Sequence, residues 1–254
     1  MSPALSYAQD KNTNQLNDRG QKTGFWLVLD QDGNKRYEGY FKDGHPTDTL
    51  KRYYPNGANK AIMVYDITGI NVKAEIFDEA GKLRAKGNYI DKQKDRKWFF
   101  YGSRKNLMLE IEYKKDLPDG HGIRYFANGD TMERTNWKKG ILHGIQLVYM
   151  EGGIKSSEYF YDMGQLDGPY LIYYPEGDLA LKGAYLKKKK EGDWVYYLRG
   201  GKIDYTLSYV DGEAANKEVL DQRQKETFDH YDKVKGKIKD PGMYLSDPES
   251  YFRK

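Results

Sequence analysis

The chain of 254 residues contains no cysteine. Disulfides and thiolate metal sites are therefore excluded, and the fold does not depend on oxidation. Long apolar runs are also missing, and no segment approaches the roughly 18 consecutive apolar residues that a membrane-spanning helix needs. The sequence thus predicts neither a disulfide framework nor a helical membrane protein.

An excess of one charge is missing as well. The net charge is +4, from 42 basic and 38 acidic residues that are interspersed along the chain. Proteins that bind nucleic acids usually concentrate basic residues on one face. The composition therefore predicts no nucleic-acid partner.

Aromatic residues are abundant in a chain that is otherwise polar. They make up 15% of the residues, including 24 tyrosines, and the mean hydropathy is -0.92. A large aromatic side chain can bury on the order of 150–250 Å². Aromatic residues must therefore provide most of the buried surface, which favours a thin sheet lined with rings.

A 24-residue repeat organises the sequence. The segment that begins at Gly144 starts again at Gly168, and the same step places eight units, without insertions, at residues 24, 48, 72, 96, 120, 144, 168 and 192. A fixed period of this length is typical of repeat architectures. We number positions from the start of each unit, so that Gly24 is position 0 of unit 1.

Each unit predicts a β-hairpin. Position 5 is aromatic in seven units, and position 9, glycine in seven units, marks a tight turn between two strands. Position 17 is aromatic throughout, which predicts a structural ladder of Phe41, Tyr65, Tyr89, Tyr113, Trp137, Tyr161, Tyr185 and Tyr209. Eight hairpins predict an all-β array, an elongated and twisted antiparallel sheet.

Several unit positions refine this prediction. Along the second strand, positions 11, 13 and 17 form the packing face, and glycine at position 15, as in Gly87 and Gly183, leaves space for a neighbouring ring. Asp48, Val72, Arg96 and Lys105 replace the usual turn glycines. Looser or longer turns are expected at these sites.

The flanks divide into three further segments. Residues 1–20 predict a disordered leader, in which Ser6-Tyr7-Ala8 resembles the end of a secretory signal. The repeats occupy 24–212, and residues 213–236 predict a helix that caps the last strand. Residues 237–254 form a tail that either lies on the sheet as a strap or docks another protein through Met243, Tyr244, Tyr251 and Phe252.

The recurring Gly-x-x-x-x-Tyr-Tyr-x-x-Gly of Gly168 to Gly177, with Tyr161-Asp-Met-Gly164 before it, resembles MORN repeats. It is more similar to the bacterial variant in proteins often labelled antitoxin-like. The resemblance implies scaffolding, dimerisation or lipid binding. Multi-unit forms with an export signal resemble cell-envelope proteins of Gram-negative bacteria.

No catalytic motif is found: nucleophile elbows, phosphate loops and zinc signatures are absent from the sequence. His121 and His143 fall on adjacent turns, yet a metal site needs further ligands, so we predict no metal and no cofactor. Glu110 and Glu112 leave a glycan hydrolase as an alternative. A surface salt-paired with Arg134 and Lys138 is the favoured interpretation, with no catalytic residue and no small-molecule substrate.

The prediction is a non-catalytic scaffold of a bacterial cell-envelope assembly, periplasmic, associated with the outer membrane or secreted. It would bind a protein through the tail and through rings that are left over from the core: Tyr54, Phe126, Tyr174 and Tyr196. The alternatives are a cytoplasmic antitoxin-like binder and a protein that binds lipid surfaces. For the last, Lys187 to Lys190 would contact anionic lipid, although a simply solvated turn is the favoured explanation of this run.

Overall fold

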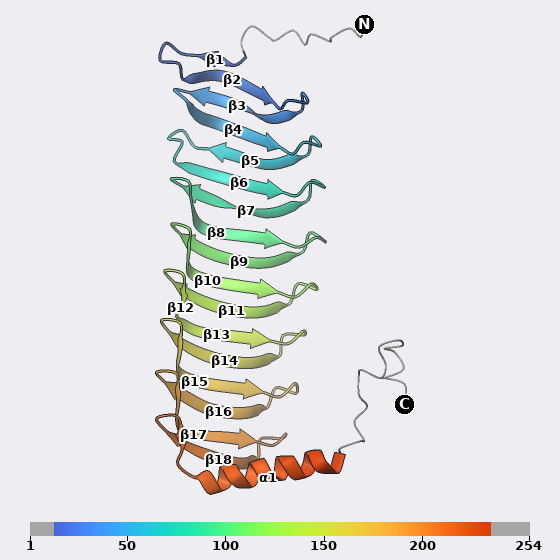
Figure 1. Cartoon of the computed structure of the whole chain (residues 1–254), viewed down its shortest axis with the longest axis vertical. Helices are drawn as coiled ribbons and strands as arrows, with labels where there is room; N and C mark the ends of the chain where they lie inside the picture. The colour runs from blue at the N-terminus through green and yellow to red at the C-terminus, as the bar shows by residue number, and fades with distance from the viewer. Residues whose placement is uncertain (1–12, 235–254) are drawn as a thin grey trace, which may run out of the picture.

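In the computed structural model, residues 13–234 are described, and they form one antiparallel sheet of 19 strands with a helix at its C-terminal end (Figure 1). Each strand pairs with its neighbours in the chain. The elements are β1 (Gln15–Leu16), β2 (Lys22–Leu29), β3 (Lys35–Lys42), β4 (His45–Tyr53), β5 (Asn59–Tyr65), β6 (Asn71–Phe77), β7 (Leu83–Ile90), β8 (Gln93–Tyr101), β9 (Leu107–Lys114), β10 (Leu117–Tyr125), β11 (Thr131–Lys138), β12 (Ile141–Leu142), β13 (Gly144–Tyr149), β14 (Lys155–Asp162), β15 (Gln165–Tyr173), β16 (Leu179–Leu186), β17 (Lys189–Tyr197), β18 (Ile203–Val210), β19 (Glu213–Ala214) and α1 (Lys217–Val234).

The predicted array of eight hairpins is confirmed. In unit 1, β2 pairs with β3 so that Gly24 lies opposite Phe41 and Trp26 opposite Gly39. In each of the other seven units, position 2 likewise lies opposite position 15. The turn inside the hairpin is closed by two backbone hydrogen bonds, from Asp30 N–H to the Asn34 carbonyl and from Gly33 N–H to the Asp30 carbonyl. The 24-residue period is therefore one hairpin and its connection to the next.

The atypical turns behave in two ways. Asp48, Arg96 and Lys105 adopt φ angles of 56°, 61° and 65°, the left-handed conformation that glycine takes elsewhere, so the looser turns expected there are not formed. Val72 does not adopt this conformation, and β5 connects to β6 through residues 66–70, whereas residues 43–44 suffice between β3 and β4. The longer turn expected at Val72 is present.

The N-terminal leader is shorter than predicted, because residues 13–20 belong to the array. Asn14 acts as a peptide-like bracket: its side chain accepts from Leu27 N–H at 2.8 Å and donates to the Leu27 carbonyl at 2.9 Å. Trp26 Nε1 also donates to the Gln15 carbonyl at 3.0 Å. These contacts satisfy the outer edge of β2, which composition alone does not reveal. Residues 1–12 lie outside the described part.

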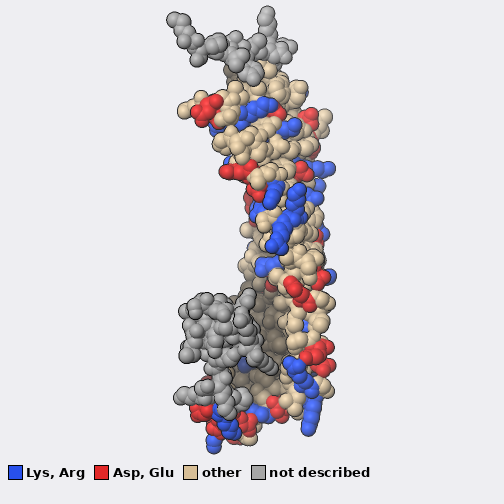
Figure 2. Space-filling model, turned by 90° about the vertical axis from the view of Figure 1, so that its right-hand side faces the viewer, with Lys and Arg blue, Asp and Glu red and all other residues tan. Residues whose placement is uncertain are grey.

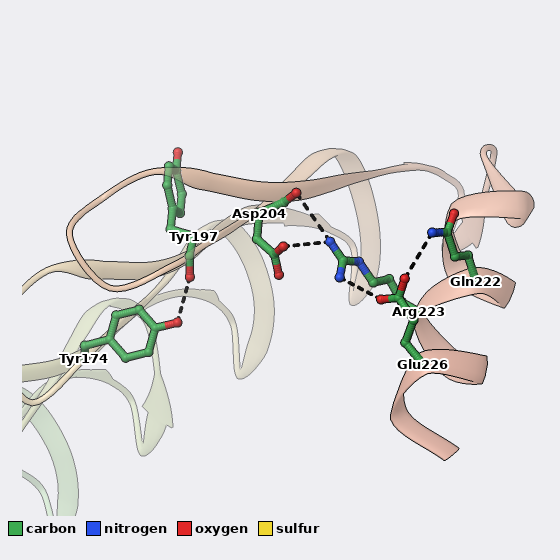
Figure 3. Close-up of polar contacts among 6 residues, drawn as sticks. All are labelled: Tyr174, Tyr197, Asp204, Gln222, Arg223 and Glu226. Atoms are coloured by element: carbon green, nitrogen blue, oxygen red, sulfur yellow. Dashed lines mark hydrogen bonds and ion pairs between the residues drawn. The ribbon is translucent and has the colours of Figure 1, made fainter. Parts of the chain in front are cut away.

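The C-terminal cap also differs from the prediction. Residues 213–214 first pair with β18 as a short strand, so the helix begins at Lys217 instead of 213. Asn216 repeats the bracket of the N-terminus: its side chain accepts from Ser208 N–H at 2.9 Å and donates to the Thr206 carbonyl at 2.9 Å. Arg223 of α1 then binds Asp204 at 2.7 Å and Glu226 at 2.8 Å (Figure 3). Both ends of the sheet are therefore closed by side chains.

The core lies on one face of the sheet, which we call the inner face and define as unit positions 2, 4, 13, 15 and 17. It contains two buried clusters, one around Ala74, Ala85 and Trp98, the other around Trp194, Leu207 and Tyr209. Trp98 and Trp194 are 0% and 2% exposed. Because side chains alternate along a strand, positions 3, 5, 14 and 16 project from the opposite, outer face.

The space predicted over the position 15 glycines is used by tryptophan. A Cβ on Gly87 would lie 2.2 Å from the Trp98 ring, and one on Gly183 would lie 2.4 Å from the Trp194 ring. At other junctions a large residue at position 15 lies opposite a small one at position 2 of the next unit, as in Met63 opposite Ala74. Tyr159 and Tyr170 are the exception, because two large rings lie opposite each other with their centroids 4.8 Å apart.

Candidate binding face

The inner face is open along most of its length. Within residues 13–234 the chain forms a single sheet and a single helix, so no second layer covers this face. The helix α1 packs against the C-terminal cluster through Val219 and Leu220. Figure 2, turned toward the hairpin turns, shows acidic and basic side chains mixed along that edge and a hollow beside the lower units.

The middle of the inner face is polar. Between the two apolar clusters, Arg124 contacts Glu133 at 3.6 Å, and Gln146 donates a hydrogen bond to the same carboxylate. Trp137 Nε1 donates to Thr135 Oγ1 at 2.8 Å. The face therefore offers apolar surface at two places, separated by groups that form directional hydrogen bonds.

Three lysines lie over the tryptophans of the inner face. Their ammonium nitrogens are 4.6 Å (Lys22), 5.3 Å (Lys94) and 4.4 Å (Lys190) from the centroids of Trp26, Trp98 and Trp194. A cation over an aromatic face is stabilised by the ring quadrupole. These contacts are not among those predicted from the sequence, although the spacing Lys-x-x-x-Trp occurs at all three places.

Two of the predicted partner-binding rings, Tyr54 and Tyr174, connect adjacent hairpins. The Tyr54 hydroxyl donates to the Phe77 carbonyl at 2.9 Å, and the Tyr174 hydroxyl donates to the Tyr197 carbonyl at 2.7 Å (Figure 3). Phe126 occupies the same unit position without a hydroxyl. These residues lie in the hairpin turns, at the edge of the array.

The fourth ring, Tyr196, lies on the inner face. It packs against the C-terminal cluster and stacks on Tyr205, with ring centroids 4.3 Å apart and planes 11° from parallel. The structure therefore does not bring the four rings together into one strip. Met243, Tyr244, Tyr251 and Phe252 lie outside the described residues.

The rings at position 17 line the inner face. Phe41 and Tyr209 are buried, and Tyr89 and Tyr185 meet Trp98 and Trp194 edge-on, with centroids 4.9 Å and 5.1 Å apart. The remaining ladder residues are half-buried. The ladder thus supplies both core contacts and accessible aromatic surface.

Alkaline pH should destabilise the C-terminal cluster. Burial, followed by neighbouring tyrosines, raises the pKa of Tyr170 and Tyr196 to about 12, above the ordinary value of 10.0. A raised folded-state pKa gives stability that is complete below pH 10 and is lost as the pH rises toward 12. We expect the urea midpoint to fall between neutral pH and about pH 11, and to fall less in Tyr196→Phe. An equal fall in both proteins would show that ionisation of Tyr196 does not contribute to the loss of stability.

Removing the Tyr174 hydroxyl should weaken the contact between units 7 and 8. Tyr174→Phe leaves the ring in place and loses one hydrogen bond to a carbonyl, at a cost of about 1 kcal/mol. The unfolding free energy from chemical denaturation measures this loss. The matched change Phe126→Tyr tests the reverse, since it adds a hydroxyl at the same unit position.

The sequence candidates for chemistry remain dispersed. Glu110 pairs with Lys97 at 3.7 Å, and Glu112 accepts a hydrogen bond from His121 N–H at 3.2 Å, so their partners are not the predicted Arg134 and Lys138. His143 faces Asp162 at 3.2 Å. Across residues 13–234, no group of three or more histidine or acidic residues is arranged to hold a metal ion.

Comparisons with known proteins bear mainly on the repeat. The family model described as "MORN repeat variant" matches residues 71–91, which span the hairpin of β6 and β7. No curated protein matches the chain. Among solved structures, the chain is similar to a chain of the Tc holotoxin pore of Photorhabdus luminescens, with 14% identity and a TM-score of 0.20 over 73% of this chain. It spans 12% of that chain, and we draw nothing further from the similarity.

Proposed function

Because the chain is a MORN-repeat protein, we propose that it is a non-catalytic scaffold that binds a partner protein along its inner face. The observation that supports this is the inner face itself, which no second layer covers within residues 13–234 and where most aromatic side chains are half-buried and not fully buried. Apolar patches on a soluble protein typically mark interaction sites. Tyrosine and tryptophan suit this role, because they give a large contact area at low entropic cost.

Photo-crosslinking from the two faces tests this proposal. Arg124 on β10 belongs to the inner face, and Arg134 on β11 to the outer face; both side chains are exposed. A photoreactive residue at 124 should capture a partner in the native host, and one at 134 should not. Capture from position 134 alone would place the partner on the outer face and contradict the proposal.

We also propose a cell-envelope setting for this scaffold. The motif Ser6-Tyr7-Ala8 before Gln9 is its support, since small residues at these spacings precede signal cleavage. Fractionation of the native host, with mass spectrometry of the protein's N-terminus, tests it. A chain that starts at Gln9 in the envelope fraction is expected. Recovery of the intact N-terminus in the cytoplasm would favour the antitoxin-like alternative.

A second candidate, binding to an anionic lipid surface, has one supporting feature. The turns between units and the strand ends beside them carry eight exposed lysines that form no ion pair within residues 13–234, and exposed apolar side chains lie beside them. The lysines are Lys42, Lys92, Lys114, Lys115, Lys138, Lys139, Lys187 and Lys188; the apolar residues are Leu117, Ile141, Met163 and Leu186. Consecutive turns are two strand spacings apart, roughly 10 Å, so these residues form one edge.

Vesicle binding tests the lipid candidate. Of the predicted run Lys187 to Lys190, Lys189 pairs with Asp211 at 2.7 Å and Lys190 lies over Trp194. Neutralising Lys187 and Lys188 should therefore weaken salt-sensitive binding to anionic vesicles, by roughly 1 kcal/mol per lysine. Neutralising Lys189 serves as the matched control and should have less effect. Equal losses would argue against the lysine edge as the contact.

A further inference from the structure

The inner face contains a recurring seat for an ammonium group. Lys22, Lys94 and Lys190 occupy the same place relative to the unit that follows, two residues before its start. Besides its tryptophan, each lysine contacts the position 17 ring of that unit, at 5.2 Å (Phe41), 5.2 Å (Tyr113) and 4.8 Å (Tyr209). The fold thus places an alkylammonium side chain against the position 17 ring at three separate sites.

The other five units have the position 17 ring without the lysine, and among them unit 3 also has a cavity beside the ring. The corresponding residue is Ile70, whose side chain is 51% exposed, and the position 17 ring of this unit is Tyr89. A cavity of about 770 Å³ opens here, lined by Met63, Tyr65, Val72 and Tyr89 as well as by Ile70. Its volume falls in the range of small-ligand sites, roughly 300–1,000 Å³.

The wall of this cavity is a well-ordered turn. In residues 66–70, the Asp66 carboxylate accepts hydrogen bonds from the Thr68 hydroxyl at 2.7 Å and from Asn71 Nδ2 at 2.6 Å. These bonds lower the pKa of Asp66 to about 2. Thr68, Gly69 and Ile70 line the cavity, so this turn forms one of its walls.

The polar groups at the cavity leave a place for a cation. The Tyr65 hydroxyl contacts the Met63 sulfur at 3.7 Å, a weak acceptor. Asp91 and Lys92 lie at the mouth, and both are exposed. Within residues 13–234 the Asp91 carboxylate forms no ion pair, so it is available to a positively charged ligand.

We propose that this cavity binds an alkylammonium group, specifically a lysine side chain of the partner protein, seated on Tyr89 as this chain's own lysines are seated on equivalent rings. This inference rests on the proposed function, because the lysine is supplied by the bound partner. The apolar stem would lie on Met63 and Val72, and the ammonium would face the Tyr89 ring and Asp91. A cation on a ring and a carboxylate nearby both favour a positive ligand.

The site is tested first with a small probe. In protein labelled at the methionine methyl groups, n-butylammonium should shift the Met63 NMR signal saturably, whereas n-butanol and butyrate should not. Asp91→Asn should weaken the probe several-fold, and Lys92→Gln should strengthen it. Ile70→Lys introduces the lysine that units 1, 4 and 8 carry at this place and should abolish probe binding. Ile67→Lys adds the same charge on the same turn, at a side chain that does not line the cavity, and should bind as before.

The outcomes separate the site from the wider function. Stronger binding of butyrate, or equal loss in Ile67→Lys and Ile70→Lys, would overturn the proposal even if a partner is still captured. With the partner, Ile70→Lys should reduce capture and Ile67→Lys should not, and unchanged capture in Ile70→Lys would refute the lysine as the bound group. If the probe binds but no partner is captured by either face, the proposed scaffold function fails while the ammonium seat stands.

Discussion

Replacing Gly87 with alanine is expected to destabilise the array by about 3 kcal/mol or more. The added Cβ would lie 2.2 Å from the ring of Trp98, a side chain that is fully buried and cannot move outward. Trp98 is also held by a hydrogen bond from its Nε1 to the Asn88 carbonyl at 2.9 Å. Denaturant unfolding followed by circular dichroism measures the loss.

A double substitution serves as the control for this prediction. Met63 opposite Ala74 shows that the fold accepts a large residue at position 15 when position 2 of the next unit is small. Gly87→Met with Trp98→Ala should therefore be more stable than the sum of the two single losses implies. Additive losses would show that the Gly87 and Trp98 pair is not the cause.

The unit in which glycine is replaced should decide how much of the array is destabilised. In a repeat array each unit contacts mainly its neighbours, so stability is a sum of local terms. Gly183→Ala makes the same clash with Trp194 in the last unit and should loosen the C-terminal end alone. Gly87→Ala should raise hydrogen exchange on both sides of unit 4. Uniform exchange in both variants would mean that the array unfolds as one block.

Removing the two asparagine brackets is expected to make the array associate end to end. Asn14 and Asn216 satisfy both hydrogen-bonding groups of Leu27 at one edge, and groups of Ser208 and Thr206 at the other. Unpaired strand edges are templates for pairing with another chain. Asn14→Ala with Asn216→Ala should cost about 1–3 kcal/mol per edge and make the sedimentation coefficient rise with concentration.

A third asparagine gives the matched control. Asn136 lies within the array and donates from its side chain to the Ile145 carbonyl at 2.7 Å, so Asn136→Ala loses a similar bond without exposing an edge. It should reduce stability and leave the protein's mass in solution unchanged. Association of the Asn136 variant would show that lost stability, not the open edge, drives assembly.

Period, hairpins and the space over Gly87 could be read from the sequence, because each depends on residues at fixed spacing. The roles of the candidate binding residues could not be predicted in this way. Tyr196 belongs to the core and Tyr174 to a contact between hairpins, since the face of a ring depends on bulges that spacing does not reveal. The seat at Tyr89 could not be predicted either. Its recognition requires the three lysine–ring contacts of the other units, with which Ile70 and Tyr89 can be compared.

The leader shows a different limit. Its residues are polar, and low hydrophobicity predicted disorder, yet Asn14 closes the sheet by using its amide as a substitute peptide group. Hydropathy measures what a segment can bury. It does not measure how well one side chain fits an edge.

The uneven row of residues along the inner face also bears on how the chain avoids misfolding. Near-identical repeats can pair with the wrong neighbour, and such misassembly is a characteristic failure of repeat proteins. Here a slip by one unit would set Trp98 against Met63 instead of Gly87, where even an added Cβ would lie 2.2 Å from the ring. Neighbouring junctions therefore differ in the side chains that they match, and a slip by one unit is disfavoured even though the hairpin backbones are alike.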